Sequence, residues 1–70
     1  MTLSFDQWQV LSELTRYPLG RPFKGENQKE AILELCKDKL VCDPHTMGSS
    51  MFTRITEKGA EALKNYREHQ

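Results

Sequence analysis

The chain has 70 residues, of which 37% are hydrophobic and 29% charged, and its equal numbers of basic and acidic side chains give a net charge of zero. This length indicates one small domain (1–70), and the composition is too apolar for a disordered chain. No apolar run approaches the ~20 residues that a membrane span needs. Residues 1–15 contain Asp6 and Glu13 but no Lys or Arg, which argues against a secretory signal peptide. We therefore expect a cytoplasmic protein with no membrane partner.

The first predicted element is a helix over about residues 5–17. Ser4 and Gln7 have the spacing of a capping box. Apolar side chains then recur at steps of three or four residues, as expected for one buried helix face: Trp8, Leu11 and Leu14. Pro18 and Gly20 are predicted to end the helix.

A loop and a second helix are predicted next. Residues 18–26 (PLGRPFKGE) contain two prolines and two glycines, a composition typical of loops. Asn27 and Glu30 repeat the capping-box spacing and are followed by an apolar stripe, which predicts a helix over about residues 28–39. The concentrated positive charge of the chain lies between these first two helices.

A β-hairpin is predicted after the second helix. Residues 40–42 (LVC) and 51–55 favour strands, and the segment between them, residues 43–50 (DPHTMGSS), is rich in turn formers. We therefore expect a two-stranded antiparallel hairpin with a loop of about eight residues.

A final helix is predicted over about residues 57–68, with Ala60, Leu63 and Tyr66 facing inward. Thr56 can both end the second strand and cap this helix, because an N-cap residue keeps extended dihedral angles. Gly59 in the first turn predicts the close approach of another backbone, from the first helix or the hairpin. The expected fold is a small α+β domain in the order helix-helix-strand-strand-helix.

Two segments resemble bacterial winged-helix regulators. Ile55-Thr56-Glu57-Lys58-Gly59, followed by Leu63, is similar to the segment that closes their wing. Residues 31–43 (AILELCKDKLVCD) are similar to the end of their recognition helix running into the first wing strand, where a leucine–x–x–Gly–leucine–valine pattern is common. The resemblance covers about residues 28–64 and implies a small winged-helix-like domain. The nine residues between Tyr17 and Asn27 leave no room for a full preceding helix, so the helix-turn-helix is truncated.

The leading hypothesis is a small non-enzymatic regulator of transcription that binds duplex DNA through the second helix and the wing. Asn and Gln suit contacts to adenine, and Arg and Lys suit phosphate or guanine. Zero net charge and the truncated motif weigh against this reading, and Asn27 could be a cap beside a solvated basic loop. The candidate nucleic-acid contacts are Arg21, Lys24, Asn27, Gln28, Lys29, His45, Thr46, Ser49, Ser50 and Arg54.

The alternative hypothesis is a protein-binding adaptor or inhibitor on the same scaffold. Its candidate contacts are the apolar side chains of Leu19, Phe23 and Met47, which would form an adaptable surface. Leu19 and Phe23 could equally fold back over the core. The resemblance also implies a possible homodimer through the first and last helices. A compact chain of this kind would suit a phage or a mobile element.

Neither a metal, a cofactor nor an enzymatic activity is expected. Cys36, Cys42 and His45 lack the clustered spacing of zinc ligands, and a Cys on a helix's apolar stripe is usually a small hydrophobic residue. Asp43, His45 and Ser49 lie on one predicted loop, which cannot preorganise a catalytic triad. The sequence GRPFKG lacks the spacing of a phosphate-binding loop.

Overall fold

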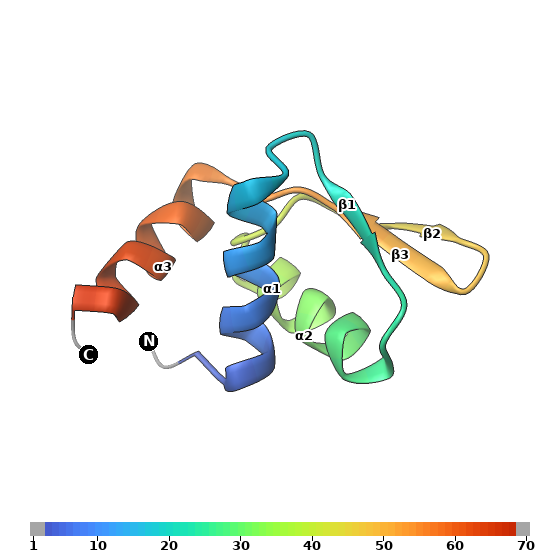
Figure 1. The fold of residues 1–70 in the computed structure, drawn as a ribbon, viewed down its shortest axis with the longest axis horizontal. Helices are drawn as coiled ribbons and strands as arrows, with labels where there is room; N and C mark the ends of the chain where they lie inside the picture. Colours follow the sequence, from blue (N-terminus) through green and yellow to red (C-terminus); the bar gives the residue numbers. More distant parts are fainter. Residues whose placement is uncertain (1–2, 69–70) are drawn as a thin grey trace.

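A computed structural model describes residues 3–68 of the chain. Within these residues the protein is a small α+β domain of three helices and one antiparallel sheet (Figure 1). The elements in chain order are α1 (Phe5–Arg16), β1 (Arg21–Phe23), α2 (Glu26–Lys37), β2 (His45–Met47), β3 (Ser50–Thr53) and α3 (Glu57–Glu68).

The sheet has three strands rather than the predicted two, in the order β1-β3-β2. The additional strand, β1, lies in the segment that was predicted to be a loop. It pairs antiparallel with β3, with Arg21 opposite Thr53 and Phe23 opposite Met51. Pro22 is compatible with this strand because β1 is at the edge of the sheet, where a missing N–H breaks no hydrogen bond of the ladder.

The hairpin is placed further along the chain than predicted. Residues 40–42 do not form a strand; Val41 alone forms an isolated bridge, with Ile55. The first hairpin strand is β2, within the predicted loop, and Met47 pairs with Ser50 across a turn of Gly48 and Ser49. Gly48 has φ +63°, as a glycine at the first central position of a two-residue hairpin turn requires. The predicted eight-residue loop is therefore wrong.

Helix α2 begins and ends two residues earlier than predicted. Its N-cap is Gly25, not Asn27, so the predicted capping box at Asn27 is wrong. At its other end Lys39 has φ +60°, and the N–H of Leu40 donates to the carbonyl of Leu35 at 2.9 Å. This closes the helix in a Schellman motif, with a lysine in the left-handed position that glycine usually occupies.

The predicted caps of the other two helices are confirmed. The capping box of α1 is complete, because Ser4 and Gln7 each accept from the other's main-chain N–H. The hydroxyl of Thr56 accepts from the N–H of Gly59 at 3.0 Å and donates to the carbonyl of Lys39 at 2.8 Å. The close approach predicted at Gly59 is also present, but the approaching backbone is that of Leu40, between α2 and β2, rather than the first helix or a hairpin strand.

The core lies between the three helices and the inner face of the sheet. Helix α1 packs against both α2 and α3, and the β2–β3 hairpin projects away from the helices (Figure 1). Ala60 is exposed rather than buried, whereas Leu63 is buried and Tyr66 packs against the core. The buried apolar residues are Leu3, Val10, Leu11, Leu14, Phe23, Ala31, Ile32, Leu35, Leu40, Val41 and Leu63. None of the described helices has the length and apolar character needed to cross a bilayer.

Candidate functional site

The first turn of α2 lacks a side-chain cap. Gly25 occupies the N-cap position and has no side chain that could accept a hydrogen bond, so nothing on it covers the first-turn N–H groups. These groups form the positive end of the helix dipole, where anions are stabilised. Lys24 is exposed immediately before this turn. These main-chain donors were not predicted from the sequence; the signal for them is the glycine directly before the acidic Glu26, since glycine is accepted at an N-cap.

Lys29 joins this end of α2 to the hairpin turn. Its Nζ donates to the carbonyl of Ser49 at 3.2 Å and lies 3.2 Å from a carboxylate oxygen of Glu26. Because of this contact, the start of α2 and the hairpin turn lie at one end of the molecule. Asn27 in the same helical turn is exposed and Gln28 is half-buried.

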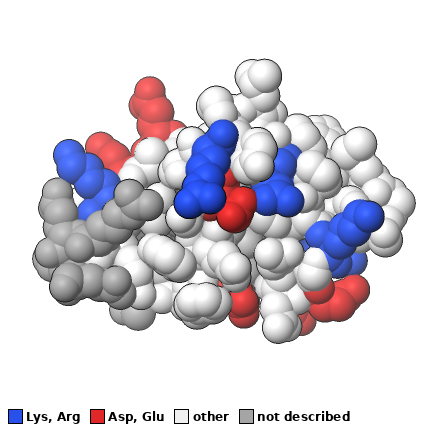
Figure 2. Space-filling view, in the orientation of Figure 1, with Lys and Arg blue, Asp and Glu red and all other residues white. Residues whose placement is uncertain are grey.

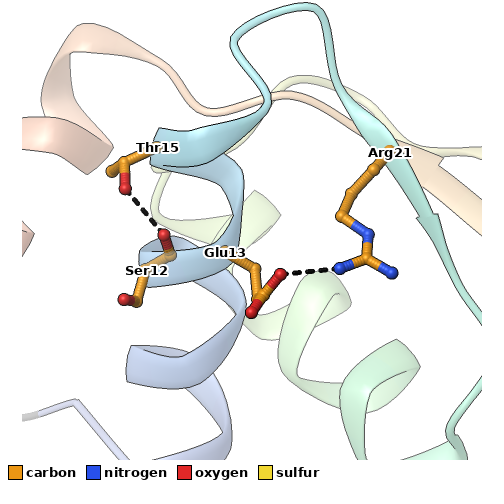
Figure 3. A network of polar contacts seen from close by, with 4 residues as sticks. All are labelled: Ser12, Glu13, Thr15 and Arg21. Carbon is orange, nitrogen blue, oxygen red and sulfur yellow. Dashed lines mark hydrogen bonds and ion pairs between the residues drawn. The ribbon is translucent and has the colours of Figure 1, made fainter.

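The side chain of Arg21 makes several contacts within the protein. Its Nη1 lies 2.7 Å from Oε2 of Glu13, so the side chain ties β1 to α1 (Figure 3). The guanidinium carbon also lies 5.2 Å from the ring centre of Tyr17 and 5.0 Å from that of Phe23, within the range of cation–π attraction. Arg21 therefore contacts α1 and two aromatic rings, and its side chain is only partly exposed, unlike that of Lys24.

The hairpin candidates are divided among different surfaces. His45 and Thr46 are exposed on β2. Ser50 is only 9% exposed, so its side chain is covered and it is no longer a candidate for contact with nucleic acid. Arg54 is exposed just after β3, at the end away from the turn, where its Cγ lies beside Gly20. The structure therefore does not bring Arg54 together with Lys29.

The candidates for protein binding are also divided. Leu19 is 82% exposed and Met47 is 59% exposed, so both can contact another molecule. Phe23 is only 3% exposed and belongs to the core, because its place in β1 opposite Met51 turns its side chain towards the helices. Its proposed role in a binding surface is therefore wrong.

The two cysteines are half-buried free thiols. Partial burial, together with a 3.5 Å hydrogen bond from Cys36 Sγ to Asp43 Oδ1, raises the pKa of Cys36. Among residues 3–68 there is no group of three or more His, Cys, Asp or Glu side chains arranged to hold a metal ion.

Positive and negative side chains are intermixed over the face shown in Figure 2. Lys and Arg lie in separate groups, each beside Asp or Glu, and large uncharged areas separate them.

The chain matches no family model, no curated protein and no solved structure.

Proposed function

We propose that this chain is a small, non-enzymatic, intracellular regulator of winged-helix type that binds duplex DNA through the first turn of α2 and the hairpin turn. The contact between Lys29 and the carbonyl of Ser49 carries the proposal, because it joins a helix start and a hairpin turn into one surface.

The arrangement of the chain around α2 supports the winged-helix type. An antiparallel hairpin follows α2, and β1 adds a third strand beside β3. Lys39 stands directly before Leu40 and Val41, where the wing-forming pattern of these regulators has a glycine, and its φ of +60° is a conformation typical of glycine.

The chemistry of this surface suits a phosphate contact with limited reading of bases. Lys24 and the uncapped N–H groups of α2 can bind a phosphate, which needs no base sequence. Asn27 is exposed at the second position of the helix and can reach a base edge with its amide. Thr46 and Ser49 add exposed hydroxyls from the hairpin.

The expected dependence on salt is shallow. Two lysines lie at this end of α2: Lys24 is exposed, and Lys29 contacts the hairpin turn and Glu26. Each phosphate that such a lysine neutralises contributes a slope of about −0.9 to log K against log salt. A slope of about −2 is therefore expected.

Fluorescence anisotropy with a short mixed-sequence duplex over a range of salt concentrations tests the proposal. Lys24→Gln and Lys29→Gln should each weaken binding and bring the slope closer to zero by about one unit. Lys64→Gln removes the same charge from an exposed position on α3 and should change neither quantity. Absence of binding at low salt, or equal effects of all three variants, would refute the proposal.

The composition of the hairpin favours a second candidate, a protein-binding adaptor or inhibitor. Residues 44–53 carry no formal charge at neutral pH, in a chain with 29% charged residues. Met47 projects from this uncharged hairpin with more than half of its surface exposed. An uncharged, exposed strand with a flexible apolar side chain, as β2 is, is suited to contact with another polypeptide.

A further inference from the structure

The outer strand of the hairpin, β2, has an uncovered edge. In the sheet order β1-β3-β2, one side of β2 pairs with β3, and no strand within residues 3–68 pairs with its other side. All three residues of β2 are exposed. Figure 1 shows the hairpin extending away from the helices, and none of them lies along this edge.

The register determines which peptide group of β2 points outward. Met47 and Ser50 flank a two-residue turn, so they form a hydrogen-bonded pair. Hydrogen-bonded and non-hydrogen-bonded pairs alternate along an antiparallel ladder, so the pair formed by Thr46 and Met51 is not hydrogen-bonded. The N–H and the C=O of Thr46 therefore point away from β3, to the free edge.

The opposite edge of the sheet, on β1, has no outward N–H at its central residue. The backbone groups of Phe52 point towards β2, so its other neighbour, Pro22, directs its backbone to the outside of β1. Proline has no N–H, and the outward position of β1 therefore offers an acceptor without a donor. Thr46, in contrast, offers both a donor and an acceptor at the free edge of β2.

The β2 edge also lacks the charges that usually prevent pairing between molecules. Edge strands are commonly protected by Lys, by inward-pointing charges or by Pro. Residues 45–53 contain no Lys, Arg, Asp or Glu, so the strands of two such hairpins bring no like charges of their own together.

We infer that the β2 edge binds a second copy of this chain by antiparallel strand pairing centred on Thr46. One outward donor and one outward acceptor on the same residue complement themselves about a twofold axis, which is what a symmetric dimer requires. His45 of each copy then lies opposite Met47 of the other, and the two sheets become continuous. The inference does not depend on DNA binding; it gives the second candidate function a defined partner.

The dimer is expected to be weak. Three exposed residues on each side form a contact well below the area of a standard stable interface. Dissociation constants of about 100 µM to 1 mM are appropriate for contacts of this size.

Sedimentation equilibrium of the full chain, without nucleic acid, tests the inference. The average mass should rise from the 8.1 kDa of one chain towards twice that value as the concentration increases to about 1 mM. Thr46→Pro removes the outward N–H without breaking a bond to β3 and should hold the mass at that of a monomer. Thr46→Val keeps the N–H and should dimerise like the unmodified chain.

Disulfide cross-linking tests the inference even if Thr46→Pro unfolds the protein. The two Thr46 Cα atoms of a hydrogen-bonded antiparallel pair lie about 5.5 Å apart, within the range of a disulfide. With oxidised glutathione, and with Cys36 and Cys42 both replaced by Ser so that no other thiol reacts, Thr46→Cys should form a covalent dimer much faster than Ser49→Cys on the neighbouring turn. A monomer at all concentrations, a dimer that survives Thr46→Pro, or equal cross-linking of the two cysteine variants would overturn the inference.

Discussion

The carbonyl oxygen of Leu40 occupies the space into which a β-carbon on Gly59 would project. The same carbonyl accepts the N–H of Thr56 at 3.2 Å, and the hydroxyl of Thr56 donates to Lys39. The start of α3 is thus fastened to the segment that leaves α2. This junction places the hairpin next to the second helix and so creates the proposed contact surface.

Gly59→Ala should destabilise the protein by about 1–3 kcal/mol, since the new methyl group meets a backbone carbonyl that cannot move independently. Helix propensity alone predicts the opposite sign, a gain of about 1 kcal/mol. Urea unfolding measures the difference. Ala60→Gly, at the exposed neighbouring position, should cost about 1 kcal/mol through propensity alone. A more stable Gly59→Ala variant would show that the contact with Leu40 is not tight.

Lys39→Gly should stabilise the protein by about 0.5–1 kcal/mol, because glycine adopts the positive φ of this position without the steric cost of a β-carbon. Asp38, with φ −92°, provides the control: Asp38→Gly should lower the stability. Thermal unfolding followed by circular dichroism compares the two variants. A lower melting temperature for Lys39→Gly would contradict the left-handed conformation of residue 39.

Arg21 and Glu13 should show a small coupling energy. Their side chains are 37% and 31% exposed, so solvent screens the ion pair and a value of about 0.5 kcal/mol is expected. A double-mutant cycle with Arg21→Met and Glu13→Gln isolates this value. The coupling should decrease at high salt. No coupling at low salt would mean that the contact in Figure 3 does not contribute to stability.

The thiol of Cys36 should be less reactive than an ordinary cysteine, because partial burial and the hydrogen bond to Asp43 raise its pKa. The folded state favours the protonated thiol, so its contribution to stability is complete below the unfolded-state pKa and is lost as pH rises through the higher folded-state pKa. Asp43→Asn removes the nearby negative charge and should accelerate alkylation of Cys36 at mildly alkaline pH, measured by peptide mass spectrometry. Asp38→Asn should leave the rate unchanged; equal rates in all three proteins would contradict the assigned cause.

Elements with strong local determinants could be predicted from the sequence. Ser4 with Gln7 marks the start of α1, and Thr56 marks the start of α3, because each cap uses residues within one helical turn. The close approach at Gly59 was also predictable, since a glycine early in a helix has a cost that a tight contact explains.

The strands depended on contacts between distant segments. β1 has three residues, too few for a periodic pattern, and it exists through its pairing with β3. β2 was concealed by the turn-forming residues Pro44 and Gly48 on either side of it. The tight turn at Gly48 and Ser49 determines the register, and the sequence alone did not distinguish it from a longer loop.

The candidate site was also only partly predictable, because some of its residues depend on tertiary contacts. Lys24, Asn27 and Lys29 were identified by residue type, and all three lie around the first turn of α2. The pairing of Arg21 with Glu13 and the burial of Ser50 are tertiary contacts, which no local pattern indicates. These contacts remove Arg21 and Ser50 from the candidate nucleic-acid contacts but leave Lys24, Asn27 and Lys29.

A chemical-shift map of the chain with short mixed-sequence duplex DNA tests the central claim most directly. At low salt, shifts should concentrate at residues 24–29 and 45–49, decrease at moderate salt, and leave α3 unchanged. No shifts at low salt, or shifts confined to α1 and α3, would contradict the proposal that α2 and the hairpin form the contact surface.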